Sequence, residues 1–337
     1  MKINLDNYDV IHLGVSGGKD STAALLWLVH QSGWDPAKFD VTFCDTGNED
    51  LFTYRYLEML STEVHPVKTV HPPMDFWELA KYKKRFPSRR ARFCTESLKI
   101  IPSIEYVWGL GSRVLMLNGV RSAEAHNSND RGKVASFGYD EMTGCDVYRP
   151  ILDWSLDDVW DIQKRYLNLE SVLDLVRTDP YLDRASEIYF EKNGIEVDFK
   201  AELVQRMQKN GIPRNPLYDM GATRVGCFPC INSKKAEVRA MAKYRPQRID
   251  FIREKELTTG KINPVDGKTI STFFARKTVP LAHRTKLIET TKGERMLVAT
   301  IDDVARWSRT ARGGKQFDFD LLQGESFTGC LLGNYCE

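Results

Sequence analysis

The chain has 337 residues, and its 48 basic and 46 acidic side chains leave a net charge of +2. Hydrophobic residues make up 42% and charged residues 28%, which is the composition of a globular protein and excludes collagen-like, coiled-coil and wholly disordered chains. No apolar run is long enough to span a bilayer, and Asp6 and Asp9 stand where the apolar core of a signal peptide would lie. We therefore expect a cytoplasmic protein that does not enter the membrane. Seven cysteines in such a chain favour metal or redox chemistry over a disulfide framework.

The first third of the chain alternates between strand and helix patterns. Strands are predicted at 8–15, 39–44, 64–70 and 113–120, and helices at 20–30 and 51–60. This alternation is typical of a doubly wound α/β fold, with a mostly parallel sheet and helices on both faces. Ligands bind such sheets at the carboxyl ends of the strands. The segments 14–21, 45–49 and 119–124 all directly follow predicted strands, so we expect a shared site there.

Beyond Pro150 the pattern becomes helical, with helices predicted at 157–166, 181–192 and 199–209. We expect three parts: a nucleotide-binding domain at 1–163, a helical insertion at 164–212, and a third part at 213–337. The third part holds a Cys-x-x-Cys pair and a C-terminal cysteine-containing module.

A glycine-rich loop stands between the first predicted strand and the first predicted helix. Its sequence is Ser16-Gly17-Gly18-Lys19-Asp20-Ser21. Glycines let successive N–H groups converge on an anion, and the start of a helix adds its dipole. The loop is not a Walker A motif, because counting from Gly14 the lysine comes one position early. It resembles the PP-loop of the N-type ATP pyrophosphatases, which implies binding of ATP by residues 16–21 and cleavage between the α- and β-phosphates.

The residue types in this loop suit that reaction. The N–H donors and Lys19 would stabilise the charge that grows on a pyrophosphate leaving group. Asp20 or Asp45 could carry Mg²⁺, which prefers carboxylate oxygens, although Asp45 could equally form a turn at the end of its strand.

Further motifs resemble one branch of that superfamily, the phosphoadenosine phosphosulfate reductase-like proteins. The first two are Asp45-Thr46-Gly47-Asn48-Glu49 and Arg92-Phe93-Cys94-Thr95, which continues to Leu98-Lys99-Ile100 and Pro102. The others are Gly119-Val120-Arg121-Ser122-Ala123-Glu124 with Arg131, Pro150 to Ser155 with Asp158-Val159-Trp160, and Asn215-Pro216-Leu217-Tyr218 followed by Arg224 to Cys230. Ala125 departs from the family, which usually has serine there. The resemblance implies an adenine nucleotide α-hydrolase-like fold. It also implies a nucleotide contact at Gly119 and contacts of Arg121 and Arg131 with a phosphoryl or sulfuryl group.

Two features bear on the reaction. The loop at 16–21 is intact, whereas reductases of this family usually have it eroded, and the chain lacks their C-terminal Glu-Cys-Gly-Leu/Ile-His motif. Both make the chain similar to the DNA-phosphorothioation sulfur-transfer ATPases, which implies adenylation of a substrate followed by sulfur transfer. Two alternatives stay open: a thiol-dependent reductase of adenylyl sulfate or its 3′-phosphate that releases sulfite, and a non-catalytic, zinc-stabilised binding module.

Three cysteines form the predicted metal site. Cys227 and Cys230 form a Cys-x-x-Cys knuckle, and the resemblance makes Cys94 a third ligand. Cys336, Cys330 or Cys145 could supply a fourth, or it could be absent. Cysteine thiolates bind both iron–sulfur clusters and zinc. We predict a 4Fe–4S cluster here, with zinc as the alternative.

The partners follow from charge and from the resemblance. Residues 81–92 hold seven basic side chains and no acid, with aromatic residues between them, and a second basic cluster begins at Arg306. This pattern suits the backbone of a nucleic acid, DNA or tRNA, or else a small adenine nucleotide. Sulfur transfer implies a sulfur donor or reductant protein, and a homo-oligomer stays open.

Overall fold

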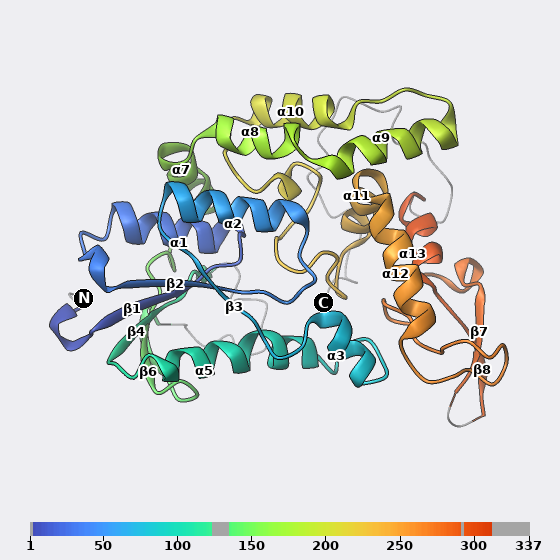
Figure 1. Ribbon diagram of the computed structural model, residues 1–337, viewed down its shortest axis with the longest axis horizontal. Helices are drawn as coiled ribbons and strands as arrows, with labels where there is room; N and C mark the ends of the chain where they lie inside the picture. The colour runs from blue at the N-terminus through green and yellow to red at the C-terminus, as the bar shows by residue number, and fades with distance from the viewer. Residues whose placement is uncertain (1–2, 123–134, 291–292, 312–337) are drawn as a thin grey trace.

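The computed structural model describes residues 3–122, 135–290 and 293–311. A six-stranded sheet has the order β3-β2-β1-β4-β6-β5 (Figure 1). The strands are β1 (Val10–Gly14), β2 (Phe39–Cys44), β3 (Lys68–Val70), β4 (Val114–Leu117), β5 (Phe137–Asp140) and β6 (Cys145–Tyr148). All neighbouring strands are parallel except the antiparallel pair β5 and β6. The predicted α/β class with a mostly parallel sheet is confirmed, and β2 has its predicted bounds.

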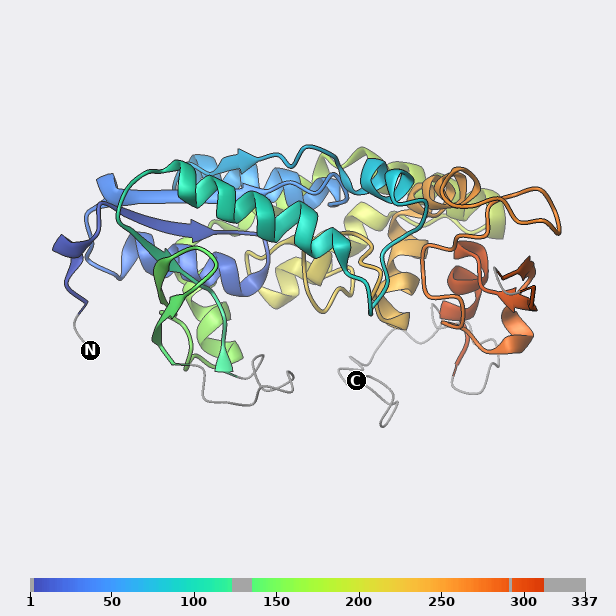
Figure 2. The ribbon, with the colours of Figure 1, turned by 90° about the horizontal axis from the view of Figure 1, so that it is seen from below.

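Helices cover both faces of this sheet. One face carries α1 (Lys19–His30) and α2 (Leu51–Glu63), and α5 (Ile101–Gly109) lies across the other, nearest the viewer in Figure 2. Strand β1 is buried on both faces, because Ile11 and Leu13 on one side and His12 on the other are each at most 3% exposed. Near-continuous apolar runs are the mark of strands buried on both faces, which is why the sequence revealed them.

Four helices follow the sheet: α7 (Leu156–Tyr166), α8 (Leu169–Arg177), α9 (Pro180–Asn193) and α10 (Phe199–Asn210). Of these, α8 was not predicted, and the other three lie within one residue of their predicted bounds. Helix α7 packs against α1, and α8 packs against α2 and α10. The division of the chain at 163 and 212 stays a prediction.

The remaining elements lie together at one end of the molecule (Figure 1). They are α11 (Lys235–Tyr244), α12 (Pro246–Thr258), α13 (Ile301–Ser308) and a hairpin of β7 (Lys286–Glu289) and β8 (Arg295–Val298). Two short helices, α3 (Phe76–Tyr82) and α4 (Phe93–Thr95), precede a π-helical turn at Glu96–Ile100 that leads into α5. Short 3₁₀ turns occur at Leu5–Asn7, Pro36–Lys38, Pro216–Tyr218 and Leu281–His283. Within the described ranges, every helix is too short or too polar to cross a bilayer.

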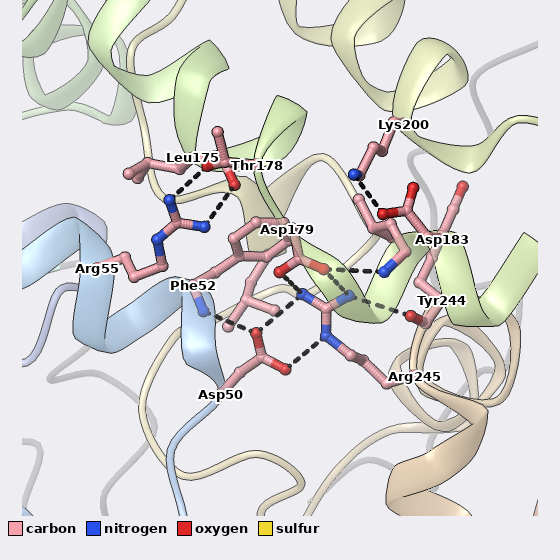
Figure 3. A network of polar contacts seen from close by, with 12 residues as sticks. Asp50, Phe52, Arg55, Leu175, Thr178, Asp179, Asp183, Lys200, Tyr244 and Arg245 are labelled. Carbon is pink, nitrogen blue, oxygen red and sulfur yellow. Dashed lines mark hydrogen bonds and ion pairs between the residues drawn. The ribbon is translucent and has the colours of Figure 1, made fainter.

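A buried arginine joins three of these parts (Figure 3). Arg245, between α11 and α12, is 1% exposed and donates five hydrogen bonds of 2.9 to 3.2 Å. Asp50 at the start of α2 and Asp179 at the start of α9 each accept two, and the carbonyl oxygen of Tyr244 accepts the fifth. Only a guanidinium group carries five donors in one planar fork, so this position requires arginine.

Candidate functional site

A cavity opens where the order of the strands reverses. The chain runs outward from β1 to β2 and β3, then returns to place β4 on the other side of β1. In doubly wound sheets this switch point is where ligands bind. A cavity of about 1130 Å³ lies there, lined by Gly14 at the end of β1, by Asn118 and Gly119 after β4, and by the glycine-rich loop. We call it the nucleotide cavity.

The glycine-rich loop is held in a closed turn before α1. Gly17 has a φ of +68°, a left-handed conformation that favours glycine, and Gly18 is the N-cap of α1. The hydroxyl of Ser21 accepts a hydrogen bond from the N–H of Ser16 at 3.1 Å and lies 3.3 Å from the Ser16 hydroxyl. The loop is therefore folded back on the first turn of the helix.

Gly119 allows β4 and α1 to approach each other closely. A Cβ atom at this position would lie 3.0 Å from the carbonyl oxygen of Asp20 and 3.2 Å from the Cα of Ser21. Gly119 therefore shapes the loop as well as lining the cavity.

Three of the four predicted catalytic side chains meet at the start of α1. Asp20 Oδ2 lies 2.6 Å from Lys19 Nζ, and Asp20 Oδ1 lies 2.5 Å from Arg121 Nε. All three side chains are largely buried. The carboxylate thus holds two cations beside the glycine-rich loop. The fourth predicted residue, Arg131, lies outside the described residues.

Asp45 lies apart from this group. Its Oδ1 accepts hydrogen bonds from the N–H of Gly47 at 2.8 Å and from the hydroxyl of Tyr54 at 2.7 Å, which is the turn that the sequence allowed as an alternative. Asp45 is not among the residues that line the nucleotide cavity. Its predicted role in metal binding stays a prediction.

The segment 215–218 contacts the glycine-rich loop directly, which the sequence did not reveal. The hydroxyl of Tyr218 accepts a hydrogen bond from the N–H of Lys19 at 2.9 Å, and the amide of Asn215 donates to the carbonyl of Gly17 at 3.4 Å. Tyr218 also lines the nucleotide cavity. Its motif was visible in the sequence, but nothing there paired it with a loop almost two hundred residues earlier.

A second, smaller cavity contains the predicted metal ligands. It has a volume of about 200 Å³, and Cys94, Cys227 and Cys230 all line it together with Lys99. We call it the thiol cavity. Burial raises the pKa of the Cys94 and Cys227 thiols. The positive charge of Lys99 partly offsets this rise for Cys227, because it favours the thiolate and so lowers the pKa.

The described residues do not fit a metal or an iron–sulfur cluster as they stand. Among them, no three His, Cys, Asp or Glu side chains are grouped closely enough to hold a metal ion. Cys227 Sγ instead lies 3.6 Å from the hydroxyl of Thr46 and 3.8 Å from Glu49 Oε1. Cys145 lies on β6 and does not line the thiol cavity. The other two proposed fourth ligands, Cys330 and Cys336, lie outside the described residues, so the 4Fe–4S and zinc assignments stay predictions.

The two cavities share a wall. The segments 224–225 and 231–233 and the side chain of Glu237 line both cavities. Within this wall, Arg224 Nη2 lies 3.3 Å from Cys230 Sγ. A group bound beside the glycine-rich loop is therefore separated from the thiols by one loop.

The basic segment 81–92 lies beside the nucleotide cavity. Its seven lysines and arginines are all exposed, and Arg89 lines the cavity. In the second basic cluster, the described Arg306 and Arg309 are exposed at the end of α13.

Comparisons with known proteins agree with the motifs. Residues 11–172 match the phosphoadenosine phosphosulfate reductase domain family. An uncharacterized 37.8 kDa protein of Escherichia phage 186 is 26% identical over 362 aligned positions, which cover 91% of this chain and 90% of the phage protein. An uncharacterized protein of Methanocaldococcus jannaschii is 26% identical over 241 positions, which cover 72% of this chain and 46% of the archaeal protein.

Two solved structures are similar at lower identity. A phosphoadenylyl-sulfate reductase from Candida auris has 15% identity and a TM-score of 0.39, with 65% of this chain and 82% of that chain covered. An NH3-dependent NAD synthetase from Campylobacter jejuni has 16% identity and a TM-score of 0.35, with 61% of this chain and 87% of that chain covered.

Proposed function

We propose that the protein, whose residues 11–172 match the phosphoadenosine phosphosulfate reductase domain family, is an enzyme that binds ATP in the nucleotide cavity and uses it to adenylate an acceptor. The acceptor attacks the α-phosphorus, the bond to the bridging oxygen breaks, and pyrophosphate leaves with that electron pair. The observation that carries this proposal is the intact loop 16–21 at the switch point of the sheet.

The side chains around the loop suit this step. Negative charge grows on the pyrophosphate as it leaves, and N–H groups at the start of α1 together with Lys19 stabilise it. Asp20 holds Lys19 in place, with its Oδ2 2.6 Å from Nζ. Mg²⁺, if bound with the phosphates, would neutralise more of their charge. Of its two predicted carboxylate ligands, only Asp20 lines the cavity.

Sulfur transfer is the second part of the proposal. It is supported by the wall that the nucleotide and thiol cavities share, with the Arg224 guanidinium 3.3 Å from Cys230 Sγ. A sulfur donor protein loads one thiol as a persulfide, and its outer sulfur attacks the adenylated atom, from which AMP leaves with the bonding electrons. The neighbouring thiol then displaces the transferred sulfur, and a reductant protein reduces the resulting disulfide. We assign no step to an iron–sulfur cluster, because the described residues do not gather its ligands.

A thiol-dependent reductase is the second candidate, favoured by the family that the domain matches. In that reaction a thiolate attacks the sulfur of adenylyl sulfate or its 3′-phosphate, the nucleotide leaves, and a second thiol releases sulfite as a disulfide forms. It predicts a covalent thiosulfonate on Cys336 or Cys330, which mass spectrometry of protein incubated with either nucleotide would detect.

The test of ATP use compares wild type with Ser16→Ala plus Lys19→Ala. Titration calorimetry with Mg–ATP measures binding, and chromatography measures release of AMP and pyrophosphate. We expect ATP affinity to fall about tenfold or more, since one hydrogen bond to a charged group is worth roughly 1.5–3 kcal/mol. Ser171→Ala plus Lys209→Ala, on α8 and α10, makes the same two changes outside the cavity and should bind as wild type does. If the loop variant binds ATP as tightly as the control variant, the proposal is wrong.

A further inference from the structure

The nucleotide cavity is large for one small molecule. Its volume of about 1130 Å³ exceeds the roughly 300–1,000 Å³ of pockets that hold a single small ligand. The glycine-rich loop accounts for only part of its lining. The other part comes from Pro87, Ser88 and Arg89, from Arg224 and Lys234, and from residues of the loop 274–278. This leaves room for a second substrate beside ATP, next to three cationic side chains.

One of these cations belongs to a small hairpin on the surface. Ser88 and Ala91 pair through two backbone hydrogen bonds of 3.0 and 3.2 Å, which places Arg89 and Arg90 at the turn. Arg89 lines the cavity, whereas Arg90 does not. The hairpin therefore lies at the edge of the cavity.

The hairpin is anchored to the body of the protein. Phe86, which directly precedes it, is 6% exposed, and its ring centroid lies 5.4 Å from that of Phe273. Phe273 packs in turn against Trp77 of α3 and against Phe274, which lines the cavity. The basic residues are thus presented from a packed aromatic base.

Positive charge continues outward from the cavity along this segment. Lys81, Lys83, Lys84 and Arg85 are exposed and are not among the cavity-lining residues. No acidic residue occurs between Glu78 and Glu96. The side chain of Tyr82, within this run, is 67% exposed, and Lys83 Nζ lies 5.6 Å from the centroid of its ring.

We propose that the segment 81–92, together with Arg224 and Lys234, binds the sugar–phosphate backbone of a nucleic-acid strand, and that this strand carries the acceptor into the nucleotide cavity. The inference rests on the proposed function, since it identifies the acceptor of that reaction. A small nucleotide inside the cavity would not reach Lys83 or Lys84, which lie beyond its lining. A row of cations with an exposed aromatic ring suits phosphates and stacked bases better than an acidic peptide.

The test measures binding of fluorescent oligonucleotides by anisotropy over a series of salt concentrations. Single-stranded DNA, single-stranded RNA and duplex DNA form three arms, and a polyglutamate peptide is the competing polyanion. Wild type is compared with Lys83→Gln plus Lys84→Gln plus Arg90→Gln. The matched control is Arg165→Gln plus Lys192→Gln plus Lys209→Gln, which removes three exposed positive charges from α7, α9 and α10.

We expect at least one nucleic-acid arm to bind and the control to bind as wild type does. Each lost phosphate contact lowers the slope of log K against log salt by about 0.7 for single strands, so the slope should fall by about 2 in the rim variant. At 0.1 M salt this corresponds to a loss of affinity of up to roughly 100-fold. No binding in any arm, equal losses in both variants, or equally tight binding of polyglutamate would overturn the inference.

ATP titration of the same wild-type preparation separates this inference from the proposed function. ATP binding without oligonucleotide binding overturns the nucleic-acid acceptor and leaves ATP use intact. Oligonucleotide binding without ATP binding supports the basic surface and overturns ATP use.

Discussion

Replacing Arg245 by methionine is expected to lower the free energy of unfolding by about 3–5 kcal/mol, the usual cost of removing one partner from a buried ion pair. Methionine keeps an unbranched apolar stem but has no charge and no donor. Asp50 is only 7% exposed and Asp179 is fully buried. In the variant, their carboxylates lose the guanidinium group that neutralises them. Both acids also cap helices, so they cannot turn away without uncapping α2 and α9.

The size of this effect follows from two opposing contributions. Four hydrogen bonds to carboxylates are lost, and at about 1.5–3 kcal/mol each they would sum to roughly 6–12 kcal/mol. Keeping Arg245 buried in the wild type carries its own desolvation cost of several kcal/mol, which the variant no longer bears. The difference is the smaller figure of about 3–5 kcal/mol.

Equilibrium unfolding in urea, followed by tryptophan fluorescence, measures this loss. Arg253→Met is the matched control, because Arg253 also pairs with two aspartates, Asp250 and Asp302, at 2.7 Å each, but is 45% exposed. Exposed pairs contribute about 0–1 kcal/mol, so the control should lose little.

The loss at Arg245 should also depend on pH. Burial raises the pKa of Asp179 even beside Arg245, and without the guanidinium it should rise further. A carboxyl group with a raised pKa in the folded state stabilises the fold at low pH, and this stabilisation is lost as the pH rises through that pKa. The difference in unfolding free energy between wild type and Arg245→Met should therefore shrink as the pH is lowered from about 8 to about 5. A loss below about 1 kcal/mol, or one that does not change with pH, would refute Arg245 as the neutralising partner.

Three further predictions concern the cavities and the C-terminal part. Gly119→Ala should weaken ATP binding and cost about 1–3 kcal/mol of stability, because its Cβ would lie 3.0 Å from backbone of α1; Gly109→Ala, with open space around it, is the control. Burial raises the pKa of Glu256 from 4.5 to about 7, so the unfolding free energy of wild type relative to Glu256→Gln should fall as the pH rises through this window. Urea unfolding over that range measures the fall, up to about 3 kcal/mol, and a constant difference contradicts it. Iron and acid-labile sulfide in anaerobically purified protein, absent from Cys227→Ser plus Cys230→Ser, would support the predicted cluster, whereas zinc without sulfide would exclude it.

The first half of the fold could be predicted because its pattern is local. The strands β1, β2 and β4 are short apolar runs, and the loop after β1 has its own signature, so both could be identified from a few adjacent residues. Helices α11 and α12 lack so clear a pattern. Helix α11 buries Glu237 and α12 buries Glu256, so charged residues stand at positions where the helical repeat requires apolar ones.

In the candidate site too, the features carried by adjacent residues could be predicted and the long-range contacts could not. The loop 16–21 and its cations Lys19 and Arg121 were predicted, because each motif follows its own strand. The contact of Tyr218 with Lys19 and the pairing of Arg245 with Asp50 join residues that are close only after the chain has folded. Periodicity carries no information about such pairs, and only the folded structure reveals them.

The segment 45–50 shows why these long-range contacts matter to function. Carboxylate chemistry made Asp45 a candidate metal ligand or else a turn residue, and in the structure Asp45 forms the turn while Asn48 contacts the loop beside the thiol cavity. The carbonyl of Asn48 accepts a hydrogen bond of 2.6 Å from the N–H of Phe228, inside the Cys-x-x-Cys loop, and its amide donates to the carbonyl of Pro229 at 3.2 Å. Two residues later, Asp50 binds Arg245.

One strand-end segment therefore connects three parts of the molecule. Residues 45–50 extend from β2, hold the loop that carries Cys227 and Cys230, and are tied through Arg245 to Asp179 of the helices that follow the sheet. Buried hydrogen bonds thus join those helices, through Arg245 and Asp50, to the segment that holds the Cys-x-x-Cys loop. The Cys-x-x-Cys loop also continues into the wall that the thiol cavity shares with the nucleotide cavity. In the proposed reaction, this segment would hold the thiols in place beside the nucleotide cavity, because Asn48 anchors the loop that carries them.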